Sequence, residues 1–372
     1  KFNKYQILYW NLLPLINKDL NKSTLNKIKK KNYINIDSFN TLRKQISLLP
    51  ANFFFWNTCG YRFISSILDR ILSIIGGKKI FIEAGTLPDT SEAVKKNYKN
   101  YINLYFKKDK YFLFKKIKSK FFTTITTLIC KKLITSTANI YFATNERTYL
   151  LYKNISNGKN VFRVDVNEIV NLKNLNKNHI KNKKKIVFID QELENPFDQQ
   201  LNYKDVAIKY NKKDYWSKLD ILFNEIEKNS KINKINIAAH PRRKKKNFPS
   251  NRKFIYDKTP KLIAESKLVL AHHSFAIHYA ILLRKPILFI YSSKMERIND
   301  VETILTLAKA TGSIALDLEK INKNKKVNLN FKKIYKFNEK KYKDYENNYI
   351  CYNNQVSYGR WKTILRHLIS IK

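Results

Sequence analysis

Residues 235–292 read INIAAHPRRKKKNFPSNRKFIYDKTPKLIAESKLVLAHHSFAIHYAILLRKPILFIYS, and this stretch decides the fold class of the chain. The apolar run Ile235–Ala239 ends at His240 and Pro241, and proline cannot continue a central strand. A second apolar run, 268–271, leads into an apolar helix predicted over 275–283, and a third strand is predicted over 286–291. Strands that alternate with helices predict a parallel sheet with crossover helices.

Parallel sheets bind ligands outside the carboxyl ends of their strands. The His-Pro loop and the turn His272-His273-Ser274 both lie at such ends, and a helix that opens on Ser274 would offer backbone N–H groups to a phosphate. Each feature also has a structural explanation, because Ser is a common N-cap, His-Pro a common turn and 242–246 a solvated basic run. Their shared place at strand ends favours a ligand site.

The composition is that of a folding chain with an extreme positive charge. Hydrophobic residues make up 44% of the 372 residues, and 73 Lys and Arg give a formal net charge of +44. Such a charge favours anionic partners. The excess is mainly Lys scattered among Asn, Ile, Tyr and Phe, the products of A/T-rich codons, so codon bias explains part of it. Without an RNP-type strand, a KH loop or a zinc-finger pattern, nucleic-acid binding is not expected.

Cysteine usage and hydropathy bear on the compartment. The three cysteines, Cys59, Cys130 and Cys351, are far apart and form no disulfide or metal pattern, which fits a reducing cytosol. No run of 18 uncharged apolar residues predicts a membrane span, and no signal peptide is recognised. The first residue is Lys, so the native start is open. We expect a cytoplasmic protein, with peripheral contact to an anionic membrane left open.

The order of the predicted elements indicates two domains. An N-terminal Rossmann-like domain is expected over 1–175, and a polar, basic connector without periodicity follows it. A second Rossmann-like domain is expected over 183–335. The tail, 336–372, is expected to carry a final helix over 359–371 that packs back towards the first domain.

One acidic residue in the first half stands where a catalytic group would project. Glu83 ends the predicted strand 79–83, and Gly85 follows closely. Two interpretations stay open: Glu83 projects into a cleft, or it only accepts hydrogen bonds from its own turn. No GxxxxGK[ST], GxGxxG, HExxH or GxSxG motif occurs, which excludes the commonest nucleotide, zinc and hydrolase signatures.

Three segments together resemble a family. IFIEAGTLPDT (80–90) resembles the acid-x-Gly motif, AAHPRR (238–243) the His-Pro motif and AHHSFAIHYAILLRKPILF (271–289) the Ser-containing motif of bacterial transferases that use CMP-activated sugar acids. These are the polysialyltransferases, related sialyltransferases and the Kdo transferases of capsule and lipopolysaccharide assembly. The sequence FIDQ (188–191) is similar to the opening of their second domain. Two positions depart from the family's pattern: His273-Ser274 stands where the polysialyltransferases have Ser-Ser or Ser-Thr, and Glu83-Ala84 stands where they have a pair of acids.

The resemblance implies an α/β chain of the GT-B type, with two Rossmann-like domains facing each other across a cleft. It implies transfer of a sugar acid (sialic acid, a related nonulosonate or Kdo) from a CMP-sugar to a surface glycan or glycolipid acceptor. Glu83 matches the catalytic base, and His240, Pro241 and Ser274 match positions near the CMP. No metal or other cofactor is expected, since His272, His273 and His278 show no regular ligand spacing.

Further residues take roles under this hypothesis. His240 would stabilise the departing phosphate, and Arg242 and His273 would join the nucleotide site. Glu265 would hold ribose hydroxyls, or it is a solvent-facing helix residue. If Glu83 is not the base, Asp89, Glu92 and Asp190 are the next candidates.

Two other functions remain as alternatives. A GT-B enzyme with a UDP- or GDP-sugar donor shares the fold and differs in its contacts to base and sugar. The second alternative is a basic nucleic-acid-binding protein, and salt-sensitive binding to a single strand or a duplex would favour it.

Overall fold

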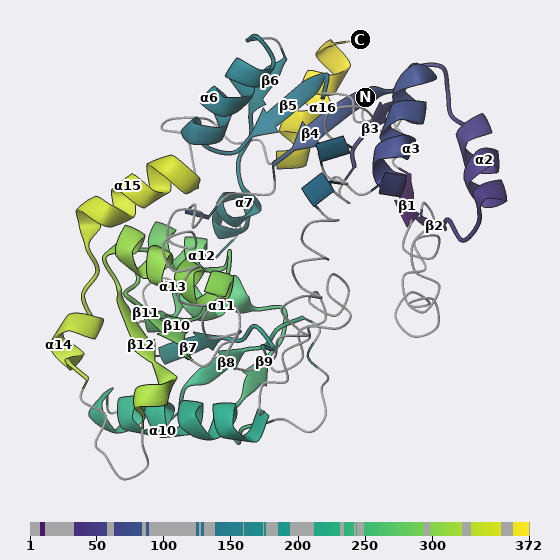
Figure 1. The fold of residues 1–372 in the computed structure, drawn as a ribbon. Helices are drawn as coiled ribbons and strands as arrows, with labels where there is room; N and C mark the ends of the chain where they lie inside the picture. The colour runs from purple at the N-terminus through teal and green to yellow at the C-terminus, as the bar shows by residue number, and fades with distance from the viewer. Residues whose placement is uncertain are drawn as a thin grey trace. The chain divides into compact units, whose positions relative to one another are not determined.

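The structure, a computed structural model, describes residues 8–11, 33–57, 63–83, 87–88, 124–125, 128–129, 138–158, 160–173, 175, 185–193, 212–230, 234–241, 243, 249–293, 298–321, 329–350 and 360–371. Figure 1 shows the order of its helices and strands. Two compact units are formed, residues 1–82 with 111–141 (unit 1) and residues 83–110 with 142–372 (unit 2). The domain boundaries expected near 175 and 183 stay a prediction.

Parallel strand pairs and helices make up the described part of unit 1. β1 (Tyr9–Asn11) pairs with β2 (Tyr33–Asn35), and β3 (Phe54–Phe55) pairs with β4 (Lys78–Ile82), both in parallel. Two helices, α2 (Phe39–Ser47) and α3 (Phe63–Ile74), contribute to a small core with the buried residues Ile36, Leu42, Leu68 and Leu72.

Two glycines, Gly76 and Gly77, follow closely after α3. Gly76 has a φ of +96°, where a side chain would be strained. A Cβ on Gly77 would come within 2.6 Å of the Leu72 carbonyl oxygen and the Phe53 ring. The chain can therefore turn directly from α3 into β4.

A four-stranded sheet has the order β3-β4-β5-β6, with β5 (Ile140–Ala143) and β6 (Val161–Arg163). After β5 comes α6 (Glu146–Ile155), whose N-cap Asn145 accepts a hydrogen bond from the Thr148 N–H. After β6 comes α7 (Asn167–Lys173). Strands and helices therefore alternate in this part of the chain as well.

Unit 2 contains a six-stranded sheet in which every pairing is parallel, with the order β12-β11-β10-β7-β8-β9. Its strands are β7 (Lys185–Ile189), β8 (Asn236–Ala238), β9 (Phe254–Ile255), β10 (Ser266–Ala271), β11 (Ile287–Tyr291) and β12 (Ile314–Asp317). Numbered from its first strand, the order is 3-2-1-4-5-6 read in reverse, which is the Rossmann order. The predicted α/β class with parallel sheets is confirmed.

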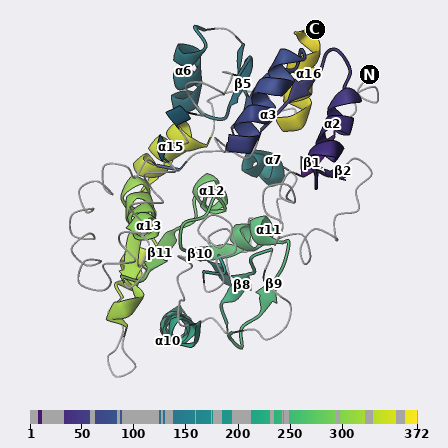
Figure 2. The same ribbon diagram turned by 45° about the vertical axis from the view of Figure 1, so that its right-hand side comes forward.

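Alternate residues along the strands face two different helical layers. Ile186 and Phe188 pack with α10 (Lys212–Ser230), while Val187 and Ile189 pack with the layer that contains α11 (Thr259–Ala264), α12 (Ile277–Leu282) and α13 (Ile298–Thr311). Figure 2 shows α10 on one side of this sheet and α11, α12 and α13 on the other. Because both faces are covered, the strands consist of nearly continuous apolar runs.

The remaining helices follow the sheet. They are a 3₁₀ turn at Leu318–Lys320, α14 (Phe331–Ile334), α15 (Glu339–Tyr349) and α16 (Arg360–Ser370). The helix predicted over 359–371 is thus present with its ends within a residue of those expected.

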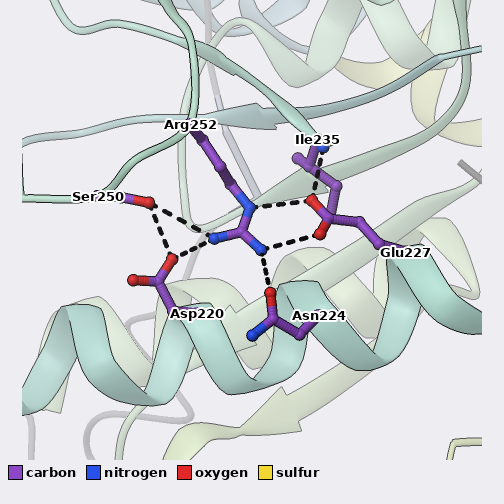
Figure 3. A network of polar contacts seen from close by, with 6 residues as sticks. All are labelled: Asp220, Asn224, Glu227, Ile235, Ser250 and Arg252. Carbon is purple, nitrogen blue, oxygen red and sulfur yellow. Dashed lines mark hydrogen bonds and ion pairs between the residues drawn. The ribbon is translucent and has the colours of Figure 1, made fainter. Parts of the chain in front are cut away.

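Arg252 ties the entry of β9 to α10 through a partly exposed network of polar side chains (Figure 3). Its Nε and Nη2 donate to the two carboxylate oxygens of Glu227 at 2.9 and 3.0 Å. Nη2 also donates to the Asn224 Oδ1 at 2.6 Å, and Nη1 donates to Asp220 and to Ser250. All three guanidinium nitrogens therefore have partners, and the network holds an edge strand onto its covering helix.

No helix in the described part of the chain has the length and apolar character that a membrane span needs. Within the same residues, no group of three or more His, Cys, Asp or Glu side chains is placed to hold a metal ion.

Candidate functional site

The strand order of the six-stranded sheet reverses between β7 and β10, the two strands that lie at its centre. In open parallel sheets, ligands bind outside the carboxyl ends of the strands at this point of reversal. Asp190 directly follows β7, and the turn His272-His273-Ser274 directly follows β10. His240 comes two residues after β8, the other neighbour of β7. The structure thus brings His240, His273 and Ser274 to one edge, together with Asp190.

Asp190 and Arg243 hold the His-Pro loop at this edge. Both side chains are buried, and the guanidinium donates to both carboxylate oxygens: Nε to Oδ2 at 2.5 Å and Nη2 to Oδ1 at 2.7 Å. The His240 N–H donates to the same Asp190 Oδ2 at 3.2 Å. A bidentate pair of this kind has a defined geometry. It fixes the start of the loop relative to the end of β7.

Aromatic rings lie next to the guanidinium of Arg243. Its guanidinium lies 5.3 Å from the Trp216 ring centroid and 5.6 Å from that of Phe254, and the Tyr256 hydroxyl donates to its carbonyl at 3.2 Å. The expectation that 242–246 is a solvated basic run is therefore wrong for Arg243. Burial against aromatic faces suits a guanidinium, which is weakly hydrated and stacks well.

His240 is half-buried next to Glu192, whose carboxylate Oε2 lies 3.6 Å from its Nδ1. Glu192 has a φ of +52°, and its N–H donates to the Asp190 Oδ1 at 2.9 Å. The carboxylate is placed to pair with a protonated imidazole, the form that can donate to a phosphate. Pro241 is exposed in the turn, and Arg242 lies outside the described residues.

His272 is a structural residue of the same edge. Its Nδ1 lies 2.6 Å from the Ile290 carbonyl oxygen, so Nδ1 carries the proton, and its Nε2 accepts from the Tyr215 hydroxyl at 2.5 Å. Burial lowers the pKa of His272 to about 4, which keeps the imidazole neutral. The ring therefore joins β10, β11 and α10 and does not act as a charged ligand.

Ser274 differs from its prediction in one respect. The helix begins at Ile277, with Ala276 as its N-cap, and not at Ser274. The Ser274 hydroxyl accepts from the Ala276 N–H at 3.2 Å, and the N–H groups of Ile277 and His278 donate to the carbonyls of Ser274 and Phe275. The amides expected to bind a phosphate are therefore already used within the turn. The Ser274 hydroxyl proton remains the donor that this residue can offer.

Glu265 lies at the other end of the sheet. It directly precedes β10, and its Oε2 pairs with the Lys185 Nζ at 2.6 Å, at the first residue of β7. The six residues of β10 rise roughly 20 Å from that end to the turn at His272. The predicted ribose contact is therefore corrected: Glu265 is a buried ion-pair residue at the amino ends of the strands, because α11 ends there and not at the carboxyl edge.

Glu83 is buried, 4% exposed, at the end of β4 in the four-stranded sheet. Its N–H donates to the Phe142 carbonyl at 3.0 Å. The carboxylate Oε2 accepts three hydrogen bonds at the start of α6: from the Thr144 N–H (2.9 Å), the Thr144 hydroxyl (2.9 Å) and the Thr148 hydroxyl (2.6 Å). The other oxygen, Oε1, is buried without a partner. One oxygen is thus held by the protein, while the second has no hydrogen-bond partner among the described residues.

Arg360, the first residue of α16, lies beside Glu83 and is 5% exposed. One of its terminal nitrogens donates to the Glu83 carbonyl oxygen, and its Nε is buried without a partner. Burial lowers the pKa of Arg360, and the carboxylates of Glu168 and Glu83 oppose that shift. Burial also raises the pKa of Glu168. Each buried polar atom that is left without a partner costs about 1–3 kcal/mol of stability.

Sequence reasoning did not identify Arg243 as part of the edge of the six-stranded sheet, or Arg360 as a neighbour of Glu83. Arg243 stands next to the His-Pro motif, so proximity to the motif was an available clue. Arg360 has no local motif, since its contact with Glu83 spans 277 positions of the chain. Asp190 was named only as a substitute for Glu83, and the structure shows it paired with Arg243.

No protein-family model matches the chain, and no curated protein matches its sequence. Among solved structures, the chain is similar to the glycotransferase of kitacinnamycin, with 7% identity and a TM-score of 0.37 over 76% of this chain and 68% of that one. It is also similar to the spinosyn forosaminyltransferase SpnP, with 9% identity and a TM-score of 0.35 over 76% of this chain and 65% of that one. It is likewise similar to UDP-GlcNAc 2-epimerase from Methanocaldococcus jannaschii, with 15% identity and a TM-score of 0.39 over 92% of this chain and 90% of that one. TM-scores of this size carry no argument for an activity.

Proposed function

We propose that this chain is a glycosyltransferase that moves a sugar from a nucleotide-activated donor to a hydroxyl of a glycan or glycolipid acceptor. The observation that carries the proposal is the point of strand reversal between β7 and β10, at the edge to which His240, His273 and Ser274 are brought. The proposed donor site is this edge. A nucleotide phosphate there would find an imidazole, a hydroxyl and a strongly basic chain around it.

In the proposed reaction, the catalytic base lies at the four-stranded sheet and the group that stabilises the leaving phosphate lies at the six-stranded sheet. Glu83, with Oε1 unpaired, would take the proton of the acceptor hydroxyl as its oxygen attacks the anomeric carbon. The bond between that carbon and the donor phosphate breaks, and the phosphate gathers negative charge. His240, with Glu192 as the partner of its protonated form, would stabilise that charge.

For the donor we propose a CMP-linked sugar acid, because the three motifs in order resemble those of transferases that use it. The alternative donor, a UDP- or GDP-sugar, would occupy the same sheet edge and differ in its contacts to base and sugar. No cofactor is part of either proposal.

Nucleotide binding tests both donor classes in one experiment. The melting temperature of the protein is measured with CMP, UDP and GDP. A nucleotide that binds, at a hundred times its dissociation constant, should raise the free energy of unfolding of the protein by about 2.7 kcal/mol. His240→Ala and Ser274→Ala should each weaken the binding of the nucleotide that stabilises the wild type by about 1–3 kcal/mol, because its charged phosphate loses a hydrogen-bond donor. If none of the three nucleotides stabilises the wild type, the proposed function fails.

We also propose that unit 1 contacts an anionic membrane surface through α3. This helix turns polar residues inward: Asp69 is buried and pairs with the Lys79 Nζ at 2.5 Å and the Asn57 Nδ2 at 3.0 Å. Its isoleucines Ile67, Ile71 and Ile74 are 36%, 38% and 71% exposed. An apolar helix face with exposed cations such as Arg70, on a chain of +44, is complementary to anionic lipid.

A further inference from the structure

Glu83 and Arg360 each keep one buried polar atom without a partner, and they lie next to each other. The atoms are the Glu83 Oε1 and the Arg360 Nε. A terminal nitrogen of the same guanidinium donates to the Glu83 backbone carbonyl, so the two side chains share one location at the end of β4. Both residues are more than nine-tenths buried.

Arg252, whose side chain is 8% exposed, shows which hydrogen-bond partners an arginine with a structural role has in this protein. Its Nε, Nη1 and Nη2 all donate to side chains on α10 or to Ser250 (Figure 3). Buried polar groups are almost always satisfied in native proteins. The unpaired Arg360 Nε and Glu83 Oε1 belong to two residues in direct contact, and one further group could satisfy both atoms.

The chemistry of the two atoms defines that group. A carboxylate oxygen only accepts hydrogen bonds, and a guanidinium Nε–H only donates. An anion would be repelled by Glu83 and by the nearby Glu168, and a cation would be repelled by Arg360. A hydroxyl satisfies both atoms, because it donates its proton to one and accepts with its oxygen from the other.

We propose that Glu83 and Arg360 bind the reacting hydroxyl of a sugar acceptor, with its O–H donated to the Glu83 Oε1 and its oxygen accepting from the Arg360 Nε. This inference rests on the glycosyltransferase function proposed above. In the transfer step the hydroxyl oxygen forms the new bond to the anomeric carbon, and the bond to the donor phosphate breaks with its electron pair. The hydroxyl proton passes to Glu83. Arg360 is thus a binding residue of the acceptor, contributed by the C-terminal helix.

The experiment uses the full chain and glycerol as a minimal hydroxyl acceptor. The sugar donor is the one whose nucleotide stabilises the wild type, either CMP-sialic acid or a UDP- or GDP-sugar. Free nucleotide and glyceryl glycoside are measured over a glycerol series for the wild type, Glu83→Gln, Arg360→Met and Arg360→Lys. Nucleotide affinity is measured for each protein by titration. Arg252→Met is the matched control, because it removes a second guanidinium, on a side chain that is 8% exposed, from outside the proposed site.

The expected result is a separation of acceptor from donor effects. Glu83→Gln should lose about a hundredfold or more in turnover, the range of general-base contributions. Arg360→Met should raise the glycerol KM by about tenfold or more, the value of one lost hydrogen bond to a charged group. Arg360→Lys should recover part of that loss, and nucleotide affinity should stay within about twofold of wild type in every variant. Arg252→Met should lower the melting temperature and leave the glycerol KM unchanged.

Three outcomes would overturn the inference. The first is an unchanged glycerol KM in Arg360→Met, which would mean that a bound water fills the place. The second is an equal rise in Arg252→Met, which would reduce the effect to general destabilisation. The third is failure of the wild type to bind any of the nucleotides, which removes the proposed function and this inference with it. An unchanged KM together with normal nucleotide binding defeats the inference alone.

Discussion

His272 couples the pH of the medium to the stability of unit 2, because it must stay neutral to keep both of its hydrogen bonds. Its Nε2 accepts from Tyr215, and burial holds its pKa at about 4. An unfolded chain takes up the proton near pH 6.5, while the folded chain does not. A depressed pKa of this kind contributes stability above pH 6.5 that is lost as the pH falls towards 4. His278, with a pKa lowered by burial to about 3, acts in the same direction.

We expect the free energy of unfolding of the wild type to fall by about 3 kcal/mol from His272 alone between pH 7 and pH 4. His272→Asn keeps a donor for the Ile290 carbonyl but cannot titrate, so its stability should fall less over the same range. Urea unfolding followed by circular dichroism at several pH values measures both slopes. The neighbours His273 and Asp190 have opposing, smaller effects on the same group. Identical slopes for both proteins would assign the acid sensitivity to other groups.

The Asp190–Arg243 pair is the second case at the residue scale. Arg243→Met should destabilise unit 2 by about 3–5 kcal/mol, because it leaves the buried Asp190 carboxylate without its partner. The double variant Asp190→Asn, Arg243→Met should recover part of that loss, since neither charge is then buried alone. Urea unfolding of both single variants, the double variant and the wild type gives the coupling energy. Additive losses would show that the pair does not act as one unit.

Among the elements, α3 has the most unusual orientation. Its buried side includes Asp69 and Ser66 as well as Leu68 and Leu72, and its exposed side is largely isoleucine. Amphipathic helices of globular proteins normally bury the apolar face. Here the ion pair of Asp69 with Lys79 ties the helix to β4, and it gives the buried Asp69 carboxylate a charged partner.

We expect the protein to bind vesicles that contain anionic lipid, and Ile71→Glu with Ile74→Glu to reduce that binding at least about tenfold, because two apolar contacts become negative charges. Cosedimentation with phosphatidylcholine vesicles, with and without phosphatidylserine, measures the effect. The control is Leu150→Glu with Leu151→Glu on α6, whose side chains are about half exposed. Equal loss in the control, or wild-type binding by the α3 variant, would contradict the assignment to α3.

At the scale of the whole molecule, the last helix of unit 2 lies against its first strands. His367 of α16 stacks on Phe162 of β6 with ring centroids 4.2 Å apart, and Arg360 reaches the Glu83 carbonyl. Asn171 of α7 donates to the Tyr279 hydroxyl of α12 at 2.7 Å, so the part of the chain before β7 is also joined to the six-stranded sheet layer. The C-terminal residues are therefore part of the environment of Glu83.

A chain that ends at residue 359 should lose stability by about 3 kcal/mol or more, because Ile364 and Leu368 lose their burial and the ring stack is lost. Nucleotide affinity should be retained, since the proposed donor site lies on the six-stranded sheet. Thermal unfolding and nucleotide titration measure the two effects. Trp361→Ala, on the exposed side of the same helix, is the control and should change neither. Loss of nucleotide binding on truncation would mean that α16 also supports the donor site.

The sequence by itself determined the elements and the edge. Apolar runs of strand length alternating with amphipathic helices predicted the parallel sheet, and the polar residues directly after those runs predicted its functional edge. Period and chain breaks are local properties, so they can be read without knowing the tertiary contacts. For this reason β10, β11 and α16 lie where they were expected, and His240 and Ser274 lie at the same sheet edge.

Only the tertiary structure decided which partner each polar side chain has. Glu265 was expected at the nucleotide and is paired with Lys185 at the opposite end of the strands, because the direction of α11 and not its composition sets that place. Arg243 was expected in solvent and is buried by Trp216, Phe254 and Asp190. The pairing of Glu83 with Arg360 joins residues 277 positions apart, and only packing can bring such residues together.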